Sequence, residues 1–268
     1  MARYNKLAGK HVLVIGGSQG IGRGVVDGAI EAQAVVTLVG SYRPNLPPTA
    51  PQSAQKAIAQ IKALYPSSSV IGLSCDLATD NVEADLENIF VEAKKAHGQP
   101  VDHVVLTAGD PLVMLAPKDI TLEKIRQVAR MRLELPTILG KVAERHLEKS
   151  RECSVTISTG GIAEQPNPGW SVTAFMAAGL TGLARNLAVD LKPIRVNAVE
   201  PGPVDTGLWE AIGLTPAQKA EQMKMWDGKL PTGKVGDVVD VAEAYLYLMR
   251  DRNATGEIVK TRGGAHLI

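Results

Sequence analysis

A run of closely spaced glycines near the N-terminus is the first feature of this sequence that could do chemistry. It reads Gly16-Gly-Ser-Gln-Gly20-Ile-Gly22-Arg-Gly24 and follows the apolar, β-branched segment His11–Ile15. Glycines allow a backbone to approach a pyrophosphate, whose charge the N–H groups and the dipole of a following helix stabilise. Because a strand is expected before the run and a helix after it, we predict a dinucleotide site rather than an ordinary tight turn. Its residues are Gly16, Ser18, Gln19, Gly20, Ile21 and Gly22.

The end of the second expected strand distinguishes NAD(H) from NADP(H). The segment Leu38-Val-Gly-Ser41-Tyr-Arg43 contains no acidic residue that would accept hydrogen bonds from a ribose 2′-hydroxyl. Ser41 and Arg43, with Arg23 nearby, could instead hold a 2′-phosphate through charge-assisted hydrogen bonds. We therefore predict NADP(H) as the cofactor. The alternative is that Arg43 only solvates the loop.

These residues must be positioned by strands and helices that alternate along the chain. Such alternation predicts βαβ units and a parallel sheet, covered by helices on both faces. Buried faces on both sides explain runs such as Val12–Ile15 and Val104–Leu106, which are apolar throughout. We predict a single Rossmann-type α/β domain over residues 1–268. It should be a doubly wound parallel sheet of about seven strands, with the ligand crevice beyond their carboxyl ends. The expected strands are His11–Ile15, Val35–Val39, Ser69–Ser74, Val101–Leu106, Ser154–Ser158, Ile194–Val199 and Glu257–Lys260.

Two stretches depart from this alternation. Tyr42–Ser53 is rich in proline and is expected to form a surface loop beside the second strand. Pro203–Lys234 is a long insertion after the sixth strand and contains the amphipathic segment Pro216–Trp226. Because long insertions in compact domains commonly carry function, we predict that residues 203–234 form a substrate lid.

The composition argues against several other classes of function. The 268 residues include 29 basic and 28 acidic side chains, and no basic run marks a nucleic-acid or lipid surface. No apolar run approaches the roughly 20 residues of a membrane span, and the N-terminus lacks the apolar core of a signal peptide. Cys75 and Cys153 lie in apolar segments and are expected to be inert thiols in a reducing compartment. We expect a cytoplasmic protein without a metal site that binds a small molecule, not nucleic acid or a membrane.

The glycine spacing Gly16-x-x-x-Gly20-x-Gly22 resembles that of the short-chain dehydrogenase/reductase family, and other motifs of the family recur along nearly the whole chain. They are Cys75-Asp76-Leu77, Thr107-Ala-Gly109, Arg195-Val-Asn197-Ala-Val-x-Pro201-Gly202 and Gly256…Gly263-Gly264. The resemblance implies a homotetramer formed through the fourth and fifth helices. It also implies further cofactor residues: Asp76 and Leu77 at the adenine, Ala108 and Gly109 beside the cofactor, and Pro201, Gly202, Val204 and Thr206 toward the nicotinamide carboxamide.

The residues with which this family reduces carbonyls are missing. Family members use an Asn on the fourth helix, a Ser after the fifth strand and a Tyr-x-x-x-Lys on the fifth helix, with the Tyr as the acid. At the matching positions this chain has Arg132, Thr159, Thr173 and Ala177. A threonine hydroxyl is far too weak an acid to protonate an alkoxide at neutral pH, and an alanine offers no charge or hydrogen bond. Ordinary ketone reduction is therefore not expected.

A rigid loop that ends in a tryptophan lies between the fifth expected strand and the helix that follows it. It reads Gly160-Gly-Ile-Ala-Glu-Gln-Pro166-Asn167-Pro168-Gly169-Trp170. Its prolines fix the backbone, and Trp170 is expected to wall an apolar pocket over the nicotinamide, unless it only plugs the fold. Arg132 could bond a substrate amide oxygen, rebuild the lost network, or serve in a structural salt bridge.

The sequence Pro166-Asn-Pro-Gly-Trp170 and the loss of the catalytic set resemble a fungal subfamily that makes bicyclo[2.2.2]diazaoctane indole alkaloids of the malbrancheamide and paraherquamide type. Those proteins are bifunctional reductases and Diels–Alderases. They reduce an iminium of a prenylated, dipeptide-derived precursor with NADPH and then guide an intramolecular [4+2] cycloaddition. An iminium is already cationic and accepts hydride without a proton donor. The resemblance implies Asn167, Trp170 and Arg132 as catalytic residues, although the subfamily has Asp where Asn167 stands, and an amide cannot take up charge.

Two other classes of function stay open. One is a reductase of a different carbonyl or imine, with Ser158 or Thr159 as its acid. The other is an inactive NADP(H)-binding protein that serves as a sensor or a partner subunit. The iminium reductase predicts a deep apolar pocket bordered by Trp170, Arg132 and the lid, which a sensor would not need.

Overall fold

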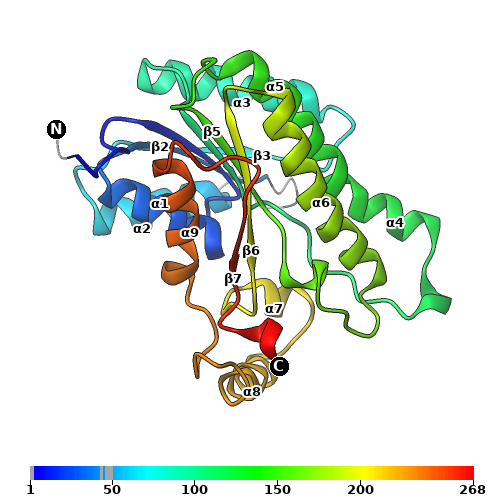
Figure 1. Ribbon diagram of the computed structural model, residues 1–268. Helices are drawn as coiled ribbons and strands as arrows, with labels where there is room; N and C mark the ends of the chain where they lie inside the picture. The colour runs from blue at the N-terminus through cyan, green and yellow to red at the C-terminus, as the bar shows by residue number, and fades with distance from the viewer. Residues whose placement is uncertain (1–2, 43–44, 46–50) are drawn as a thin grey trace.

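A parallel sheet of seven strands lies between two layers of helices in the computed structural model, which describes residues 3–42, 45 and 51–268 (Figure 1). The strand order is β3-β2-β1-β4-β5-β6-β7, and every neighbouring pair is parallel. The predicted doubly wound sheet is confirmed, with strand ends within two residues of those expected. The strands are β1 (His11–Ile15), β2 (Val35–Ser41), β3 (Val70–Cys75), β4 (His103–Leu106), β5 (Ser154–Ser158), β6 (Arg195–Pro201) and β7 (Ile258–Thr261).

The apolar runs in the strands serve two separate cores. Along β1, Val12 and Val14 face one layer of helices, while Leu13 and Ile15 face the other. Successive side chains of a strand point to opposite faces, so a strand covered on both sides must be apolar throughout. The first layer holds α1 (Gly20–Glu31), α2 (Ser53–Leu64) and α9 (Val238–Arg250). The second holds α3 (Val82–His97), α5 (Leu135–His146) and α6 (Ser171–Asp190).

The strand order reverses between β1 and β4, and this reversal fixes where a ligand crevice can form. β2 and β3 lie on one side of β1, and β4 to β7 lie on the other. The connections after β1 and β4 therefore diverge at the carboxyl edge of the sheet, which is where doubly wound folds bind their ligands. The glycine run begins at Gly16, directly after β1.

The fourth helix of the family is divided in this chain. A short 3₁₀ helix, η1 (Pro117–Asp119), precedes α4 (Leu122–Ala129), and a π-helical segment, η2 (Arg130–Glu134), joins α4 to α5. In Figure 1, α4 extends away from the sheet toward the right of the view. π-Helical turns inside α-helices are frequent at functional sites, and this one contains Arg132.

The predicted lid contains two helices, α7 (Leu208–Ala211) and α8 (Pro216–Asp227). The prediction that Pro216–Trp226 is amphipathic is wrong, because the apolar and polar side chains of α8 are not separated onto two faces of the helix. A capping box closes the start of α8, because the side chain of Thr215 accepts from Gln218 N and the side chain of Gln218 accepts from Thr215 N. α8 lies beyond the carboxyl edge of the sheet, beside the C-terminal 3₁₀ turn η4 (Ala265–Leu267) (Figure 1). Its apolar contacts there are Met223 and Trp226 with Leu230, Val235 and Ala265.

α6 is the one helix of the described residues with the length and composition to cross a membrane. It has 20 residues and a mean hydropathy of 1.3 over its most apolar window. A helix packed on a protein core passes the same test, and α6 buries Thr173, Met176, Ala177, Leu180 and Ala184. We therefore assign its apolar character to packing within the fold and to the outer face discussed below.

The two cysteines are free thiols, as expected. Cys153 is buried and Cys75 is half-buried. Burial is the largest cause that raises the pKa of both thiols to about 11. Both are therefore protonated, and unreactive, near neutral pH.

Candidate active site

The glycine run is closely packed against the end of β4. A Cβ on Gly16, whose φ is +96°, would lie 2.4 Å from Ala108 N, and a Cβ on Gly22 would lie 2.3 Å from Thr107 Oγ1. The amides of Thr107 and Ala108 both donate to the carbonyl of Ile15, at 2.8 and 2.9 Å. No side chain fits at these two glycines, so the backbone itself lines the crevice between β1 and β4.

The N-terminus of α1 opens onto this crevice with its amides available. The first turn carries no acidic residue, and the side chain of Gln19, at the N-cap position, makes no capping hydrogen bond. Thr206 lies against the same turn, because its side chain is 3.6 Å from the Cβ position of Gly20. A helix N-terminus with unoccupied N–H groups binds pyrophosphate. The residues present therefore fit a dinucleotide, and the predicted group from Gly16 to Gly22 surrounds this turn.

The end of β2 meets the N-terminus of α2. Ser53 Oγ donates to the carbonyl of the exposed Ser41 at 3.1 Å. Arg43, the predicted partner of a 2′-phosphate, lies outside the described residues. The side chain of Arg23 is already engaged, since Nε donates to both carboxylate oxygens of Asp27 at 2.9 and 3.0 Å and Nη1 donates to Gln60 at 3.1 Å. Its expected contribution to a phosphate site is therefore not supported.

The remaining predicted cofactor residues follow strand ends at the same edge of the sheet. Asp76 comes directly after β3 and accepts a hydrogen bond from Ala78 N at 3.0 Å, while Leu77 is buried in the core. Gly202 N donates to Thr261 O at 3.0 Å, which fixes the turn after β6. Val204 then forms a parallel bridge with Gly236. The turn thus runs from β6 toward Thr206 and the start of α1.

The hydroxyls at the family's catalytic positions are used to hold the backbone. Thr159 Oγ1 donates to Ala177 O at 2.7 Å. Thr173 is buried, and its Oγ1 donates to Val113 O at 2.8 Å. Neither hydroxyl has a proton left to give to a substrate. Together with Ala177 in place of a lysine, these contacts leave the site without the acid of the family.

Ser158 is engaged in the same way. Its Oγ donates to Leu106 O at 2.8 Å and lies 2.7 Å from the hydroxyl of Tyr245. Because Ser158 has one proton, Tyr245 is the donor in the second contact. Burial raises the pKa of Tyr245, which is fully enclosed. The alternative in which Ser158 or Thr159 supplies the acid therefore has no support in this geometry.

Arg132 is half-buried and lies over the loop after β4. Its Nη2 donates to the carbonyl of Asp110 at 2.6 Å and lies 3.3 Å from the Cβ position of Gly109. Burial lowers the pKa of Arg132, and the charge of Asp110 opposes that shift. The guanidinium is thus held against the predicted cofactor loop, with its charge in a poorly solvated position.

Asp110 is a candidate that the sequence analysis missed. Its carboxyl is half-buried, and burial raises its pKa, with Arg132 lowering it and Asp76 raising it further. No described residue donates a hydrogen bond to this carboxylate or forms an ion pair with it within 4.0 Å. The signal was available in the sequence, because Asp110 directly follows Thr107-Ala-Gly109.

The loop with Asn167 and Trp170 is joined to the loop after β4. Leu115 N donates to Gly169 O at 2.7 Å, and the bond of Thr173 to Val113 O lies beside it in sequence. Trp170 N donates to Asn167 O at 3.2 Å, which closes a turn, and the side chain of Asn167 is exposed. The loops that carry Asp110 and Trp170 are therefore in contact, and Arg132 in η2 bonds to the first of them.

A cavity lies beside the predicted lid, whereas the deep apolar pocket bordered by Trp170, Arg132 and the lid stays a prediction. The cavity has a volume of about 170 Å³ and is not bordered by Trp170 or Arg132. Its lining is Asp205, Met223, Asp227, Lys234, Val235, Gly236 and Asp237. α8, which contributes Met223 and Asp227 to this lining, packs Met223 and Trp226 against Leu230, Val235 and Ala265.

Comparison with known proteins gives matches over the whole chain. A family model described as an SDR-like Rossmann domain matches residues 3–268. The chain is 39% identical over 273 residues to the short-chain dehydrogenase/reductase fsr5 of Gibberella fujikuroi, covering 98% of this chain and 97% of that protein. It is 37% identical over 262 residues to the short-chain dehydrogenase/reductase malC of Malbranchea aurantiaca, covering 96% and 95%. Among solved structures, the MalC reductase/Diels–Alderase of Malbranchea aurantiaca superposes with a TM-score of 0.89, at 35% identity and 99% of both chains.

Proposed function

The chain belongs to the short-chain dehydrogenase/reductase family, and from this premise we propose that it reduces a cyclic iminium with NADPH and then guides a stereoselective intramolecular [4+2] cycloaddition. The proposed substrate is a hydrophobic, prenylated, dipeptide-derived precursor of an indole alkaloid. The similarity of this chain to a solved reductase/Diels–Alderase supports the proposed reaction. Family membership itself implies a nicotinamide cofactor and an oxidoreductase.

The observation that carries the proposal is the engagement of three hydroxyls at or next to the family's catalytic positions. Thr159, Thr173 and Ser158 all donate to main-chain carbonyls. Reduction of a ketone produces an alkoxide that needs a proton, and these groups cannot supply one. Reduction of an iminium produces a neutral amine and needs no acid. The site therefore suits a substrate that is already cationic.

The charges around the crevice agree with a cationic substrate. We assign to Asp110 the carboxylate that stabilises the iminium, a role that the amide of Asn167 cannot fill. Arg132 donates to the loop that carries Asp110 and is assigned to a substrate amide oxygen. Trp170 is assigned to the wall that selects one conformer for cycloaddition, since that step chiefly requires a fixed geometry.

The cofactor is assigned to the groups at the carboxyl edge of the sheet. When bound, NADPH supplies the hydride. The glycine run and the first turn of α1 would hold the pyrophosphate, and Asp76 would bind the adenine. The turn from Pro201 to Thr206 would bind the carboxamide of the nicotinamide. NADPH is preferred over NADH in this proposal because β2 ends without a carboxylate that could bind a ribose hydroxyl.

We also propose that the chain is a homotetramer. The outer face of α6 exposes Phe175 and Val189, and the neighbouring η2 exposes Leu133, with 71%, 63% and 51% of their surfaces accessible. Gly179 and Gly182 have no heavy atom within 4 Å of their Cβ positions, so a second backbone could approach there. Large exposed apolar residues that share a face indicate a contact between proteins.

A single-turnover experiment tests the proposed chemistry. The protein, loaded with NADPH, is mixed with a synthetic cyclic iminium and, separately, with an aromatic ketone, and oxidation of NADPH is followed by absorbance. We expect fast oxidation with the iminium and none above background with the ketone. Robust ketone turnover that Thr173→Val abolishes would contradict the proposal.

A further inference from the structure

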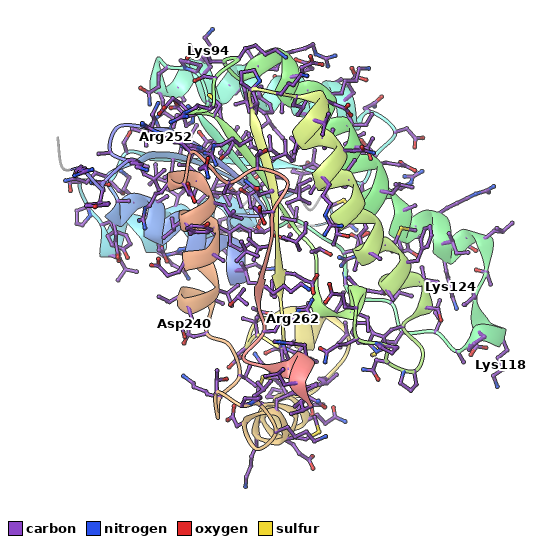
Figure 2. The ribbon with its side chains drawn as sticks, in the orientation of Figure 1. Lys94, Lys118, Lys124, Asp240, Arg252 and Arg262 are labelled. Carbon is purple, nitrogen blue, oxygen red and sulfur yellow. The ribbon has the colours of Figure 1, made fainter. Side chains whose placement is uncertain are left out.

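A buried ion pair lies at the carboxyl edge of the sheet, next to the crevice. Glu200 stands in β6 directly before Pro201, and Arg262 directly follows β7; both side chains are buried and in contact. The pairing of Pro201 with Thr261 brings the two strand ends side by side. Figure 2 shows Arg262 at the end of β7, near the C-terminal turn. Removal of one partner from a buried pair leaves an uncompensated charge, so Arg262 is firmly held.

Arg262 also bonds to the connection between β5 and α6, which lies outside the sheet. Its Nη2 donates to Glu164 Oε2 at 3.0 Å, and Lys260 Nζ donates to both oxygens of that carboxylate at 2.6 and 2.7 Å. Glu164 directly follows the 3₁₀ turn η3 (Gly161–Ala163), in the connection from β5 to α6. Arg262 also packs beneath this turn, since its Cδ is 3.7 Å from the Cβ position of Gly161. A buried charge is thus linked to a surface carboxylate of the β5–α6 loop.

The next residue of the loop is held by the C-terminal turn. Gln165 Nε2 donates to Ala265 O at 2.6 Å. Ala265 is buried with Leu230 and Val235, so its carbonyl is itself well fixed. On the far side of the loop, Gly169 O accepts from Leu115 N. Residues 166–168 therefore lie between two anchored points.

From these contacts we propose that Arg262 is a positioning residue for the candidate active site. Fixed by Glu200, it holds Glu164, and with the bond of Gln165 to the C-terminal turn it sets where Asn167 and Trp170 lie. The backbone hydrogen bonds within residues 160–170 are local, each joining residues three or four apart, so the side-chain contacts of Glu164 and Gln165 are what tie this segment to β7 and the C-terminal turn. The anchoring is independent of the proposed chemistry, whereas its effect on product formation rests on the proposed function.

Glu164→Ala tests the anchor without disturbing the core, because half of the Glu164 side chain is exposed. The control is Glu144→Ala, which removes a carboxylate of 52% exposure from a single surface ion pair with Lys149. Hydrogen–deuterium exchange is measured on the peptide that spans residues 160–170, where the amides of Ala163, Glu164, Gln165 and Trp170 are hydrogen-bonded. We expect exchange about threefold to tenfold faster in Glu164→Ala, because local opening becomes easier, and unchanged exchange in the control. Equal exchange in the two variants would overturn the proposal.

A second variant addresses Arg262 itself. Arg262→Met alone would leave Glu200 charged and buried, so the pair is replaced together, as Glu200→Met with Arg262→Met, which preserves volume. We expect a cooperative fold with faster exchange at residues 160–170 than in the unmodified chain, but slower than in Glu164→Ala, because Lys260 still donates to Glu164. The dissociation constant of NADPH should stay within about twofold of the unmodified value in Glu164→Ala, while the ratio of cycloadduct isomers shifts. Faster exchange with an unchanged isomer ratio would overturn the positioning role. Absence of turnover in the unmodified chain would count against the proposed function, and the exchange result would still decide the anchoring.

Discussion

In the proposed function, Asp110 and the position of Asn167 decide how much negative charge faces a cationic substrate. Asp110 is a half-buried carboxylate without an ion-pair partner within 4.0 Å among the described residues, and Asn167 is an exposed amide of similar shape to an aspartate. A carboxylate in a poorly solvated site stabilises a developing or fixed positive charge more than an amide does. In the proposed function, the charge at these two positions should therefore set the rate of hydride transfer to the iminium.

We expect Asp110→Asn to slow single-turnover hydride transfer by about 10- to 100-fold, the scale of one charge-assisted hydrogen bond, with little change in the affinity for NADPH. Asn167→Asp should raise the rate in the unmodified chain and recover part of it in the Asp110→Asn background. Stopped-flow absorbance of NADPH measures all four proteins. Asp119→Asn, at an exposed site in η1, is the control. Equal rates in Asp110→Asn and this control would contradict the assignment.

The proposed preference for NADPH can be tested at Arg43, which follows β2 by two residues in the sequence. Arg43→Ala should reduce the preference over NADH by about 1–3 kcal/mol, because one charge-assisted bond to a 2′-phosphate is lost. Arg23→Ala should leave the ratio nearly unchanged, since the Arg23 guanidinium is held by Asp27 and Gln60. Fluorescence titration with both cofactors gives the two affinities. Equal affinities in the unmodified protein would show that the preference is absent.

At the scale of elements, the β5–α6 loop and the loop after β4 form one unit through Gly169, Leu115, Thr173 and Val113. Trp170, which we propose as the wall, is half-buried at the end of the β5–α6 loop, and α8 packs on the C-terminal turn. Selectivity in cycloaddition should therefore depend on the loops more than on α8.

Trp170→Ala should move the ratio of cycloadduct stereoisomers toward the uncatalysed mixture, because the enlarged space admits more than one reactive conformer. Hydride transfer to the iminium should change much less. Chiral chromatography of products measures the ratio, and Trp226→Phe, in α8, is the control. A ratio that is unaffected by the loss of the Trp170 ring would show that it only fills space in the fold.

At the scale of the whole molecule, two buried histidines connect stability to pH. His11 lies 2.9 Å from Thr37 Oγ1, and His103 lies 2.9 Å from Ser154 Oγ. Burial lowers the pKa of His11 to about 4 and that of His103 to about 3. Both are therefore neutral in the native protein over a range in which the unfolded chain binds protons.

The free energy of unfolding should therefore fall as the pH drops from about 6.5 toward 4, by up to about 1.4 kcal/mol per pH unit for each histidine. Above about pH 6.5 these histidines are neutral in both states and contribute no slope. Urea unfolding at several pH values measures the dependence. His103→Asn, which removes the titratable group, should show a shallower slope. The same slope in both proteins would contradict the assignment to His103.

Assembly is also a property of the whole molecule. Phe175→Asp, on the exposed face of α6, should dissociate the proposed tetramer into smaller species, because a charge on that face opposes burial in an interface. Light scattering coupled to size-exclusion chromatography gives the mass. Tyr4→Asp, at another site with 80% exposure, is the control. A unit with the mass of one chain in the unmodified protein would rule out this interface.

The sheet and its strands could be predicted from the sequence, because strands buried on both faces appear as local apolar runs. The cofactor edge stays a prediction from the glycine run, which the structure packs closely against Ala108 and Thr107. Most of the predicted proline-rich loop, Tyr42–Ser53, lies outside the described residues. The loss of the family's catalytic residues could also be predicted from the sequence, because Thr173 and Ala177 stand at the positions of the family's Tyr and Lys. Other features depend on the tertiary structure. Thr159 and Thr173 donate hydrogen bonds to main-chain carbonyls, and α8 packs on the C-terminal turn. Arg262 forms ion pairs with both Glu200 and Glu164. These contacts join residues that are far apart in the sequence. They depend on which strands and loops are neighbours in the folded chain, and a local sequence pattern does not contain that information.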